Sequence, residues 1–598
     1  MGTTAVLDSG INGAANNGWT KFYGDWTSGD TTTRVNINII NLQNATSGND
    51  FGLDDISFGT LSTFFTIASD PVTNNQLNVC LGTPISDILY EVGGDGNAPS
   101  IISGALPPGV TTYWNGRSFK VSGTPTDTGA YSFTVRSSGC NASEQIVNIR
   151  VIEPSEAGTI ANGQSLIPAC YGTNGTISLA GQRGTVSWQT SPDAINWSAA
   201  ANNQYNNIQQ GTYYRALVQH TPACPADTSA VVKVGVKNLW EGNVDSNWHL
   251  AANWSDGNMP DKDACGGIII IPALVNKPYP VISTDDYTVK DLWIKMSALV
   301  SVCNDKTLRI GGNITSAAAG IDATAGTLAF VATGEEQQLS GSWLRQRSIK
   351  HLSVENPVGL KVSDAVNDSL YILNKLSFNH PAARFYSGDN VVLRSTAMNT
   401  ASVGKLQDGN RVYGKFIIER FIKRYQAWNM LSVPVADTAS VRQSWQEGGT
   451  TFNSDGYGTR VTGPAPSTGL DGVSASNSMK WWNSVSNQWS MVSNSITEQV
   501  NRKEGFFLYP RGDRGYGPGA AGSMTTLRAK GEVYSPANAP IYNFTAAAGA
   551  VISFGNPYAS AISLDKIFLK NSEAIDPNFL FHPVIGLPCY PGWGGQRQ

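Results

Sequence analysis

Residues that could do catalytic chemistry are few and scattered along this chain. The carboxylate pairs Asp54–Asp55, Asp261–Asp263 and Asp285–Asp286 are adjacent or nearly so, whereas the two acids of a glycoside hydrolase flank a cleft from separate strands. None of the histidines begins an HExxH motif, and neither a GxSxG elbow nor a Walker P-loop occurs. The histidines are His220, His249, His351, His380 and His582. The sequence therefore predicts a chain that is not an enzyme.

Two short motifs could bind a ligand, but local structure accounts for both. Gly517, Gly519 and Gly522 match GxGxxG, yet Pro518 lies inside the motif and no helix pattern follows, which favours a loop. Residues 511–513 read Arg-Gly-Asp, the integrin-binding motif, directly after an apolar strand pattern. A hairpin turn explains Arg511, Gly512 and Asp513 without a host receptor.

The cysteines favour disulfides over a metal site. No CxxC motif occurs, and no histidine lies at zinc-ligand spacing from a cysteine. The first six fall into neighbouring pairs, and each of the first two pairs brackets one domain-sized segment. The predicted bridges are Cys80–Cys140, Cys170–Cys224 and, as a third candidate, Cys265–Cys303. Buried free thiols are the alternative, and Cys589 is left over.

Composition is typical of an extracellular β-protein. The 598 residues include 41 Lys plus Arg and 45 Asp plus Glu, a net charge of −4 without the basic excess of a nucleic-acid-binding protein. Charged residues make up only 14%, while 62 glycines and 29 prolines indicate many turns. No apolar run approaches the ~20 residues of a membrane span. No signal-peptide pattern is visible at the start, and we expect a fragment of a longer secreted protein.

Residues 1–62 resemble the end of a jelly-roll domain. Residues 34–42 alternate with period two, and residues 52–57 read Gly-Leu-Asp-Asp-Ile-Ser, a pattern found on the last strand of jelly rolls of secreted carbohydrate-active and adhesive proteins. The resemblance implies a structural Ca²⁺ site as the only cofactor, since Ca²⁺ prefers carboxylate oxygens. The candidate ligands are Asp54, Asp55, Asn49 and Asp50. A plain structural role for Asp55, as acceptor for strand-end amides, is the alternative.

Sugar binding would need exposed aromatic side chains. The candidates in the jelly-roll segment are Trp19, Tyr23 and Trp26, and a second group is Trp481, Trp482 and Trp489. Burial in sandwich cores is the competing interpretation, because tryptophan is mostly buried. The predicted partners are therefore glycans or other surface polymers.

Two consecutive segments resemble immunoglobulin-like (Ig-like) domains of bacterial surface proteins. In residues 70–153 the matching motifs are GALPPGV and SGTPTDTGAYSFTV, with Tyr131, Phe133 and Val135 alternating inward on a strand. Residues 154–237 resemble an Ig-like repeat of large Bacteroidota surface proteins. Its motifs include Trp188, Trp197, a Thr-Tyr-Tyr-Arg run and Cys224. This second resemblance implies that Trp188 packs on a Cys170–Cys224 bridge.

The remaining chain resembles the C-terminal part of type IX-secreted proteins. Residues 240–263 carry a Trp-x-Gly…Asn-Trp…Pro pattern that opens repetitive β-domains, and the short apolar runs from residue 265 to about 395 predict a right-handed β-solenoid with parallel strands. An antiparallel sandwich is the alternative. The expected core residues of the solenoid are Leu292, Ile294, Leu308, Ile310, Leu328 and Phe330. Residues 411–598 begin with RVYGKFIIERFIKRYQAWNMLSVPV and resemble the β-domain that follows the solenoid in type IX-secreted proteins, with a fit that stops after Phe581. We expect this chain to lack the C-terminal sorting domain.

The sequence thus predicts an all-β chain of five segments, at residues 1–62, 70–153, 154–237, 239–400 and 411–598. We expect tandem Ig-like β-sandwiches, a jelly-roll remnant, a β-solenoid and an incomplete C-terminal β-domain. The predicted function is non-catalytic adhesion or scaffolding outside the cell or on its outer surface. The alternatives are an accessory region of a polysaccharide-degrading enzyme, and a filament or matrix subunit.

Overall fold

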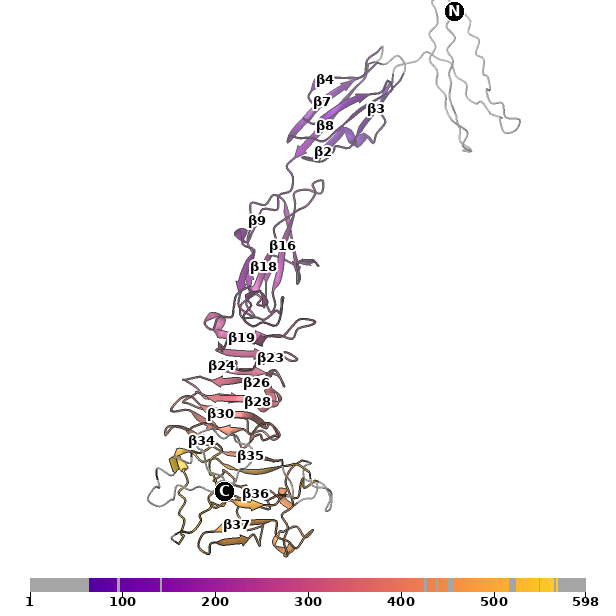
Figure 1. The fold of residues 1–598 in the computed structure, drawn as a ribbon. Helices are drawn as coiled ribbons and strands as arrows, with labels where there is room; N and C mark the ends of the chain where they lie inside the picture. The colour runs from indigo at the N-terminus through magenta and orange to yellow at the C-terminus, as the bar shows by residue number, and fades with distance from the viewer. Residues whose placement is uncertain are drawn as a thin grey trace, which may run out of the picture.

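The protein is a rod of β-structure. The computed structural model describes residues 64–93, 97–139, 142–423, 427–436, 439–449, 456–515, 523–547, 549–563, 566–567 and 570. Two β-sandwiches, a stack of short strands and a final β-domain follow one another along the rod (Figure 1). This confirms the all-β class with Ig-like sandwiches and a β-solenoid, while the exact segment boundaries remain predictions. Within the described ranges, no helix is long and apolar enough to cross a membrane.

The first sandwich packs two four-stranded sheets face to face, with orders β1-β3-β6-β5 and β2-β8-β7-β4. The strands are β1 (Phe64–Ile67), β2 (Asn75–Cys80), β3 (Ile88–Gly93), β4 (Ser100–Gly104), β5 (Val110–Trp114), β6 (Ser118–Gly123), β7 (Gly129–Arg136) and β8 (Glu144–Ile152), with the 3-10 helix η1 (Pro71–Asn74). Phe133 and Val135 are buried as predicted, and Tyr131 packs partly against the same core. Tyr90 is fully buried, and this burial raises its pKa to about 12.

The second sandwich is built around the path β10-β18-β16-β13-β14, with β17 beside β16 and two short pairs, β11-β15 and β12-β9. The strands are β9 (Thr159–Ile160), β10 (Leu166–Ala169), β11 (Gly175–Thr176), β12 (Leu179–Ala180), β13 (Thr185–Ser191), β14 (Ser198–Ala200), β15 (Gln204–Tyr205), β16 (Thr212–Gln219), β17 (Asp227–Thr228) and β18 (Val232–Val236), with the 3-10 helix η2 (Ala161–Gly163). Trp188 packs in its core beside Tyr214 and Ala216.

A β-solenoid follows, and its strands pair in parallel from β19 to β35. The strands are β19 (Ile268–Ile271), β20 (Val281–Ile282), β21 (Tyr287–Val289), β22 (Asp291–Ile294), β23 (Val300–Val302), β24 (Thr307–Ile310), β25 (Ile314–Ser316), β26 (Ile321–Phe330), β27 (Gln337–Leu339), β28 (Leu344–Val354), β29 (Leu360–Val362), β30 (Leu370–Phe378), β31 (Arg384–Tyr386), β32 (Val391–Leu393), β33 (Ser402–Val403), β34 (Arg411–Tyr413) and β35 (Lys415–Ile422). The parallel pairing excludes the antiparallel alternative. The 3-10 helices of this region are η3 (Ala251–Asn253), η4 (Ala264–Gly267) and η5 (Gly341–Trp343).

Ladders of apolar side chains fill the solenoid. Leu308 pairs with Leu328, Leu328 with Leu352, and Leu352 with Leu376 in successive turns, and all four are fully buried. The six predicted core residues, Leu292, Ile294, Leu308, Ile310, Leu328 and Phe330, all belong to this single core, which confirms that prediction. Period-two alternation places them inside because neighbouring residues on a strand face opposite ways.

Both ends of the solenoid are covered. At the start, Trp240, Trp248 and Trp254 are buried and meet edge to face, with ring centroids 5.0–5.1 Å apart. Asn253 is fully buried, and its side-chain oxygen accepts the backbone N–H groups of Val244 and Asp245. The Trp…Asn-Trp pattern in the sequence therefore encodes this cover. At the other end, β40 (Thr525–Glu532) pairs antiparallel with β35 and ends the parallel stack.

The C-terminal β-domain follows β35, the last strand of the parallel stack. Its separate sheet has the order β36-β39-β37-β38. The elements are β36 (Asn429–Leu431), η6 (Glu447–Gly449), η7 (Pro466–Thr468), β37 (Met479–Asn483), β38 (Gln488–Met491), β39 (Phe506–Leu508), β40 (Thr525–Glu532) and η8 (Pro536–Asn538). Leu527 and Ala529 of β40 enter the core of this domain, so β40 joins the domain to the solenoid.

Shortening a ladder side chain should destabilise the solenoid. Phe330→Ala removes a fully buried ring, and we expect the free energy of unfolding to fall by about 3–5 kcal/mol. Urea denaturation followed by circular dichroism measures this change. The control is Met296→Ala, at a side chain that is 79% exposed, which should change stability by less than about 0.5 kcal/mol. Equal effects of the two substitutions would contradict the buried ladder.

Candidate functional site

The ligand-binding residues predicted in the jelly-roll segment lie outside the described part of the chain. These are Trp19, Tyr23, Trp26, Asn49, Asp50, Asp54 and Asp55. Calcium and glycan binding there remain predictions. Among the described residues, no group of three or more His, Cys, Asp and Glu side chains could hold a metal ion.

The Arg-Gly-Asp motif forms a buried turn after β39. Asp513 is 6% exposed, and its carboxylate accepts the backbone N–H groups of Gly456 and Gly515. Arg511 donates through its backbone N–H to Thr459 Oγ1 at 2.9 Å. Gly512 adopts a φ of +87°, which favours glycine. A receptor would find the aspartate covered, and the motif serves the local structure of the domain.

The structure corrects the predicted cysteine pairing. It contains the disulfides Cys80–Cys224 and Cys170–Cys265, with Cα–Cα distances of 5.0 and 5.5 Å. The predicted bridges Cys80–Cys140, Cys170–Cys224 and Cys265–Cys303 are therefore wrong. Cys303 is a partly buried free thiol, and Cys140 lies outside the described residues. Each disulfide joins one domain to the next, so the bridge on which Trp188 was expected to pack does not form.

Strand order explains the interdomain pairing. In both sandwiches an early strand lies parallel to the last strand, β2 beside β8 and β10 beside β18. Cys80 at the end of β2 pairs with Ile152, and Ala169 at the end of β10 pairs with Val236. Parallel strands end at the same edge of a sheet. Each cysteine therefore lies where the chain leaves its domain, within reach of the next one.

A repeated motif in the sequence marks these two cysteines, and sequence reasoning missed it. Residues 80–83 read Cys-Leu-Gly-Thr and residues 170–173 read Cys-Tyr-Gly-Thr. In both turns the threonine hydroxyl donates to the cysteine carbonyl oxygen, at 2.6 Å in the first and 2.7 Å in the second. The glycine φ values are +79° and +77°. The same turn thus presents both cysteines.

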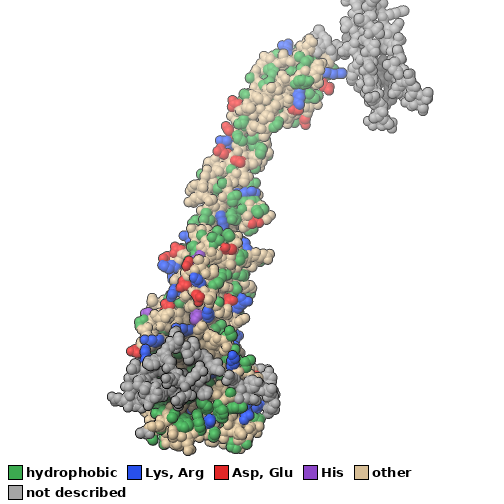
Figure 2. Space-filling model, viewed as in Figure 1, with side chains coloured by type: hydrophobic (Ala, Val, Ile, Leu, Met, Phe, Trp, Pro, Cys, Tyr) green, Lys and Arg blue, Asp and Glu red, His purple; other side chains and the backbone are tan. Residues whose placement is uncertain are grey.

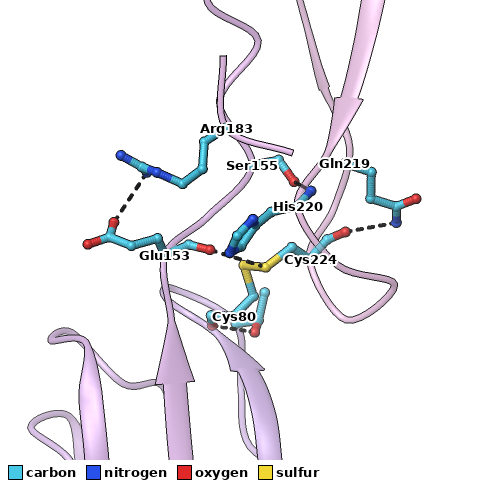
Figure 3. The surroundings of a disulfide bond; sticks show 8 residues. Cys80, Glu153, Ser155, Arg183, Gln219, His220 and Cys224 are labelled. Atoms are coloured by element: carbon cyan, nitrogen blue, oxygen red, sulfur yellow. Dashed lines mark hydrogen bonds and ion pairs between the residues drawn. A yellow bond between two sulfur atoms is a disulfide. The ribbon is translucent and has the colours of Figure 1, made fainter. Parts of the chain in front are cut away.

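The first junction joins the two sandwiches mainly through its disulfide. Figure 3 shows the loop after β16 lying against the linker that contains Glu153 and Ser155. The Cys224 sulfur lies 3.5 Å from the Glu153 carbonyl oxygen, and the backbone N–H of His220 donates to Ser155 Oγ at 3.0 Å. Among the described residues, the hydrophobic cores of the two sandwiches have no side chain in common. This junction therefore depends on one disulfide and a few polar contacts.

The second junction adds a shared hydrophobic core to its disulfide. Leu239 and Ile270, from the solenoid side, are 1% and 3% exposed and belong to the core of the second sandwich. Trp293 of β22 packs against the same core and meets the Tyr171 ring at 5.9 Å. The Lys295 ammonium lies 3.2 Å from the centroid of the Trp293 ring. Apolar contacts therefore join these two domains in addition to the disulfide.

A shielded ion pair also links the second sandwich to the solenoid. The Lys233 ammonium lies 2.8 Å from Glu241, and both side chains are about 15% exposed. Burial alone would raise the pKa of Glu241, but the Lys233 charge and hydrogen bonds from Lys233, Asn243 and Ser255 outweigh it and lower that pKa. The ionised carboxylate therefore stabilises the junction.

The second group of tryptophans divides between the two faces of one sheet. Trp481 packs toward the domain core, with the Arg502 guanidinium 3.6 Å from its ring centroid. Trp482 and Trp489 form a cross-strand pair, with ring centroids 5.1 Å apart. Trp489 is 41% exposed. The structure thus assigns a core role to Trp481 and leaves Trp489 available at the surface.

Comparison with known proteins finds one family model and solved Ig-domain structures of low identity. Residues 156–238 match a family described as a domain of unknown function, DUF8696. Similar solved structures include a three-domain Ig fragment of titin (11% identity, 30% of this chain and 67% of that chain, TM-score 0.21). Others are the first two Ig domains of DIP-gamma (14%, 30% and 98%, TM-score 0.17) and the Ig1-2 module of the Drosophila receptor protein tyrosine phosphatase DLAR (14%, 29% and 98%, TM-score 0.13). No curated protein matches significantly.

Acid should weaken the second junction through Glu241. A lowered carboxyl pKa stabilises the fold above the ordinary value of 4.5, and this stabilisation is lost as the pH falls below it. Glu241→Gln should cost roughly 1–3 kcal/mol at pH 7 and much less at pH 3. Thermal unfolding at both pH values measures the difference, with the exposed Glu91→Gln as control. A cost that is the same at pH 3 as at pH 7 would contradict the role of the carboxylate.

Proposed function

We propose that this chain is a non-catalytic extracellular scaffold, a stiff rod that holds the partners at its two ends a fixed distance apart. The observation that carries this proposal is that both disulfides cross domain junctions. Tandem sandwiches on a short linker ordinarily move relative to one another. A covalent bond beside the linker gives each junction a second connection, which opposes bending.

The extracellular location is supported by the same disulfides. Disulfides persist in oxidising compartments such as the cell exterior and the periplasm, and they are rare in the cytosol. The low content of charged residues, at 14%, is in keeping with such a location. Secretion by a type IX system and adhesion are finer proposals, and both are supported by the sequence resemblances alone.

A scaffold accounts for the structure better than a self-assembling filament subunit. A β-solenoid can polymerise by stacking its open ends, because each turn offers unpaired backbone groups to the next. Here the tryptophan cover occupies one end and β40 occupies the other. The rod therefore extends through its own domains, and the solenoid serves as one rigid section of it.

Removing each disulfide should affect the two junctions differently. The double substitution Cys80→Ser with Cys224→Ser leaves the first junction with polar contacts only, and we expect bending between the sandwiches. Small-angle X-ray scattering should then show a broader distribution of intramolecular distances. Cys170→Ser with Cys265→Ser should change the profile little, because the shared core remains. Cys303→Ser is the matched control for loss of a thiol.

Two results would overturn the proposal. A first-junction variant whose scattering matches that of the unchanged protein would show that the disulfide does not stiffen the rod. Turnover of a polysaccharide by the purified chain would show that it is an enzyme. Mass spectrometry of non-reduced peptides checks that Cys80–Cys224 and Cys170–Cys265 are the bonds present.

A further inference from the structure

The C-terminal sheet β36-β39-β37-β38 has one buried and one outward face. Leu431, Met479, Phe506 and Leu508 face the domain core, and each is less than 7% exposed. Alternation along the strands turns their neighbours outward. The outward face of an antiparallel sheet is normally polar, but this one is rich in aromatic side chains. We call it the aromatic face, and it consists of Trp428, Lys480, Trp489, Met491, Phe507 and Tyr509.

The rings of the aromatic face touch one another across strands. Cross-strand register sets Lys480 between Phe507 and Met491. The Phe507 ring lies 4.8 Å from the Trp489 ring and 6.1 Å from the Trp428 ring, centroid to centroid. Trp489 is 41% and Met491 is 50% exposed. Figure 2 shows hydrophobic side chains at the lower end of the molecule, where Figure 1 places β37.

A cation lies at the centre of these rings. The Lys480 ammonium is 4.4 Å from the Trp489 centroid, 4.5 Å from that of Trp428 and 5.7 Å from that of Phe507. Within the described ranges, Lys480 has neither an ion pair nor a hydrogen bond to a protein acceptor. The Arg511 guanidinium lies 5.8 Å from the Tyr509 ring, at the same end of the sheet. The aromatic face therefore combines flat apolar rings with positive charge.

A neighbouring segment limits the face at one side. Trp482 shares the outward side of the sheet, but its indole N–H donates to the Val551 carbonyl oxygen at 2.7 Å. The Ser484 hydroxyl donates to the Thr545 carbonyl oxygen at 3.0 Å. These bonds hold Thr545 and Val551 against that side. The side chains of Trp489 and Met491, on the neighbouring strand β38, are the exposed part of the aromatic face.

We propose that the aromatic face binds a polysaccharide that carries carboxylate groups. Sugar rings would stack on Trp489 and its neighbours, and the Lys480 ammonium would pair with a uronate carboxylate. Charge complementarity favours an acidic chain, because an anion would meet an ammonium that has no acidic partner on the described part of the protein. The face is too small for a stable protein interface, which takes about 20–30 residues from each side. Four strands at about 4.8 Å spacing make it wide enough for more than one sugar ring.

Binding of the full chain to alginate, a uronate polymer, and to laminarin, a neutral glucan, tests this inference. Affinity electrophoresis at low and high salt gives the two dissociation constants. Trp489→Ala should weaken alginate binding about tenfold or more, the equivalent of about 1.4 kcal/mol. Lys480→Met keeps the length of the side chain and removes its charge, so it should weaken alginate binding and reduce its salt dependence. The control is Tyr113→Ala, an aromatic that is 64% exposed on the first sandwich.

The outcomes separate this inference from the scaffold proposal. Thermal unfolding and scattering profiles like those of the unchanged protein show that the variants keep the fold and the rod. Loss of alginate binding in Trp489→Ala and Lys480→Met, but not in Tyr113→Ala, supports the inference. Failure of the chain to bind alginate, full binding by Trp489→Ala, or equal binding of laminarin would overturn it, and none of these results would affect the stiffness of the rod.

Discussion

Parallel pairing between an early strand and the last strand of each sandwich is the constraint on which the rod depends. It carries the end of the early strand to the edge where the chain leaves the domain. A cysteine at that end lies beside the following domain, and Cys80 and Cys170 each form a disulfide with it. The same Cys-x-Gly-Thr turn presents both sulfurs. Both domain junctions of the rod are therefore bridged by a disulfide from the same kind of turn.

The two junctions differ in what remains when the disulfide is removed. At the first junction the two sandwiches have separate hydrophobic cores, and among the described residues no buried side chain belongs to both. At the second junction Leu239 and Ile270, from the solenoid side, pack in the core of the second sandwich, and the Lys233–Glu241 pair adds a further contact that does not depend on the disulfide. Flexibility in a reducing environment would therefore concentrate between the sandwiches, while the solenoid and its neighbours move as one body.

Polar and charged groups in this protein mostly serve structure. Asp513 of the Arg-Gly-Asp motif accepts backbone N–H groups in a buried turn, and Asn253 does the same under the tryptophan cover. Burying such groups is costly unless they find hydrogen-bond partners, and Asp513 and Asn253 both find them in the nearby backbone. Lys480 departs from this pattern, because its ammonium faces aromatic rings in place of an acceptor.

The sequence by itself determined the all-β class and the six core residues of the solenoid, because alternation along a strand is a local signal. It left parallel and antiparallel pairing open, and the structure decided for parallel strands. Irregular turn lengths hid the repeat, although Leu308, Leu328, Leu352 and Leu376 stack in one ladder. Only the tertiary structure decided the cysteine pairing, because sequence spacing says nothing about which strand ends share an edge. The tertiary structure also decided which side chains of β37 face outward, because this depends on which side of the sheet the domain core covers.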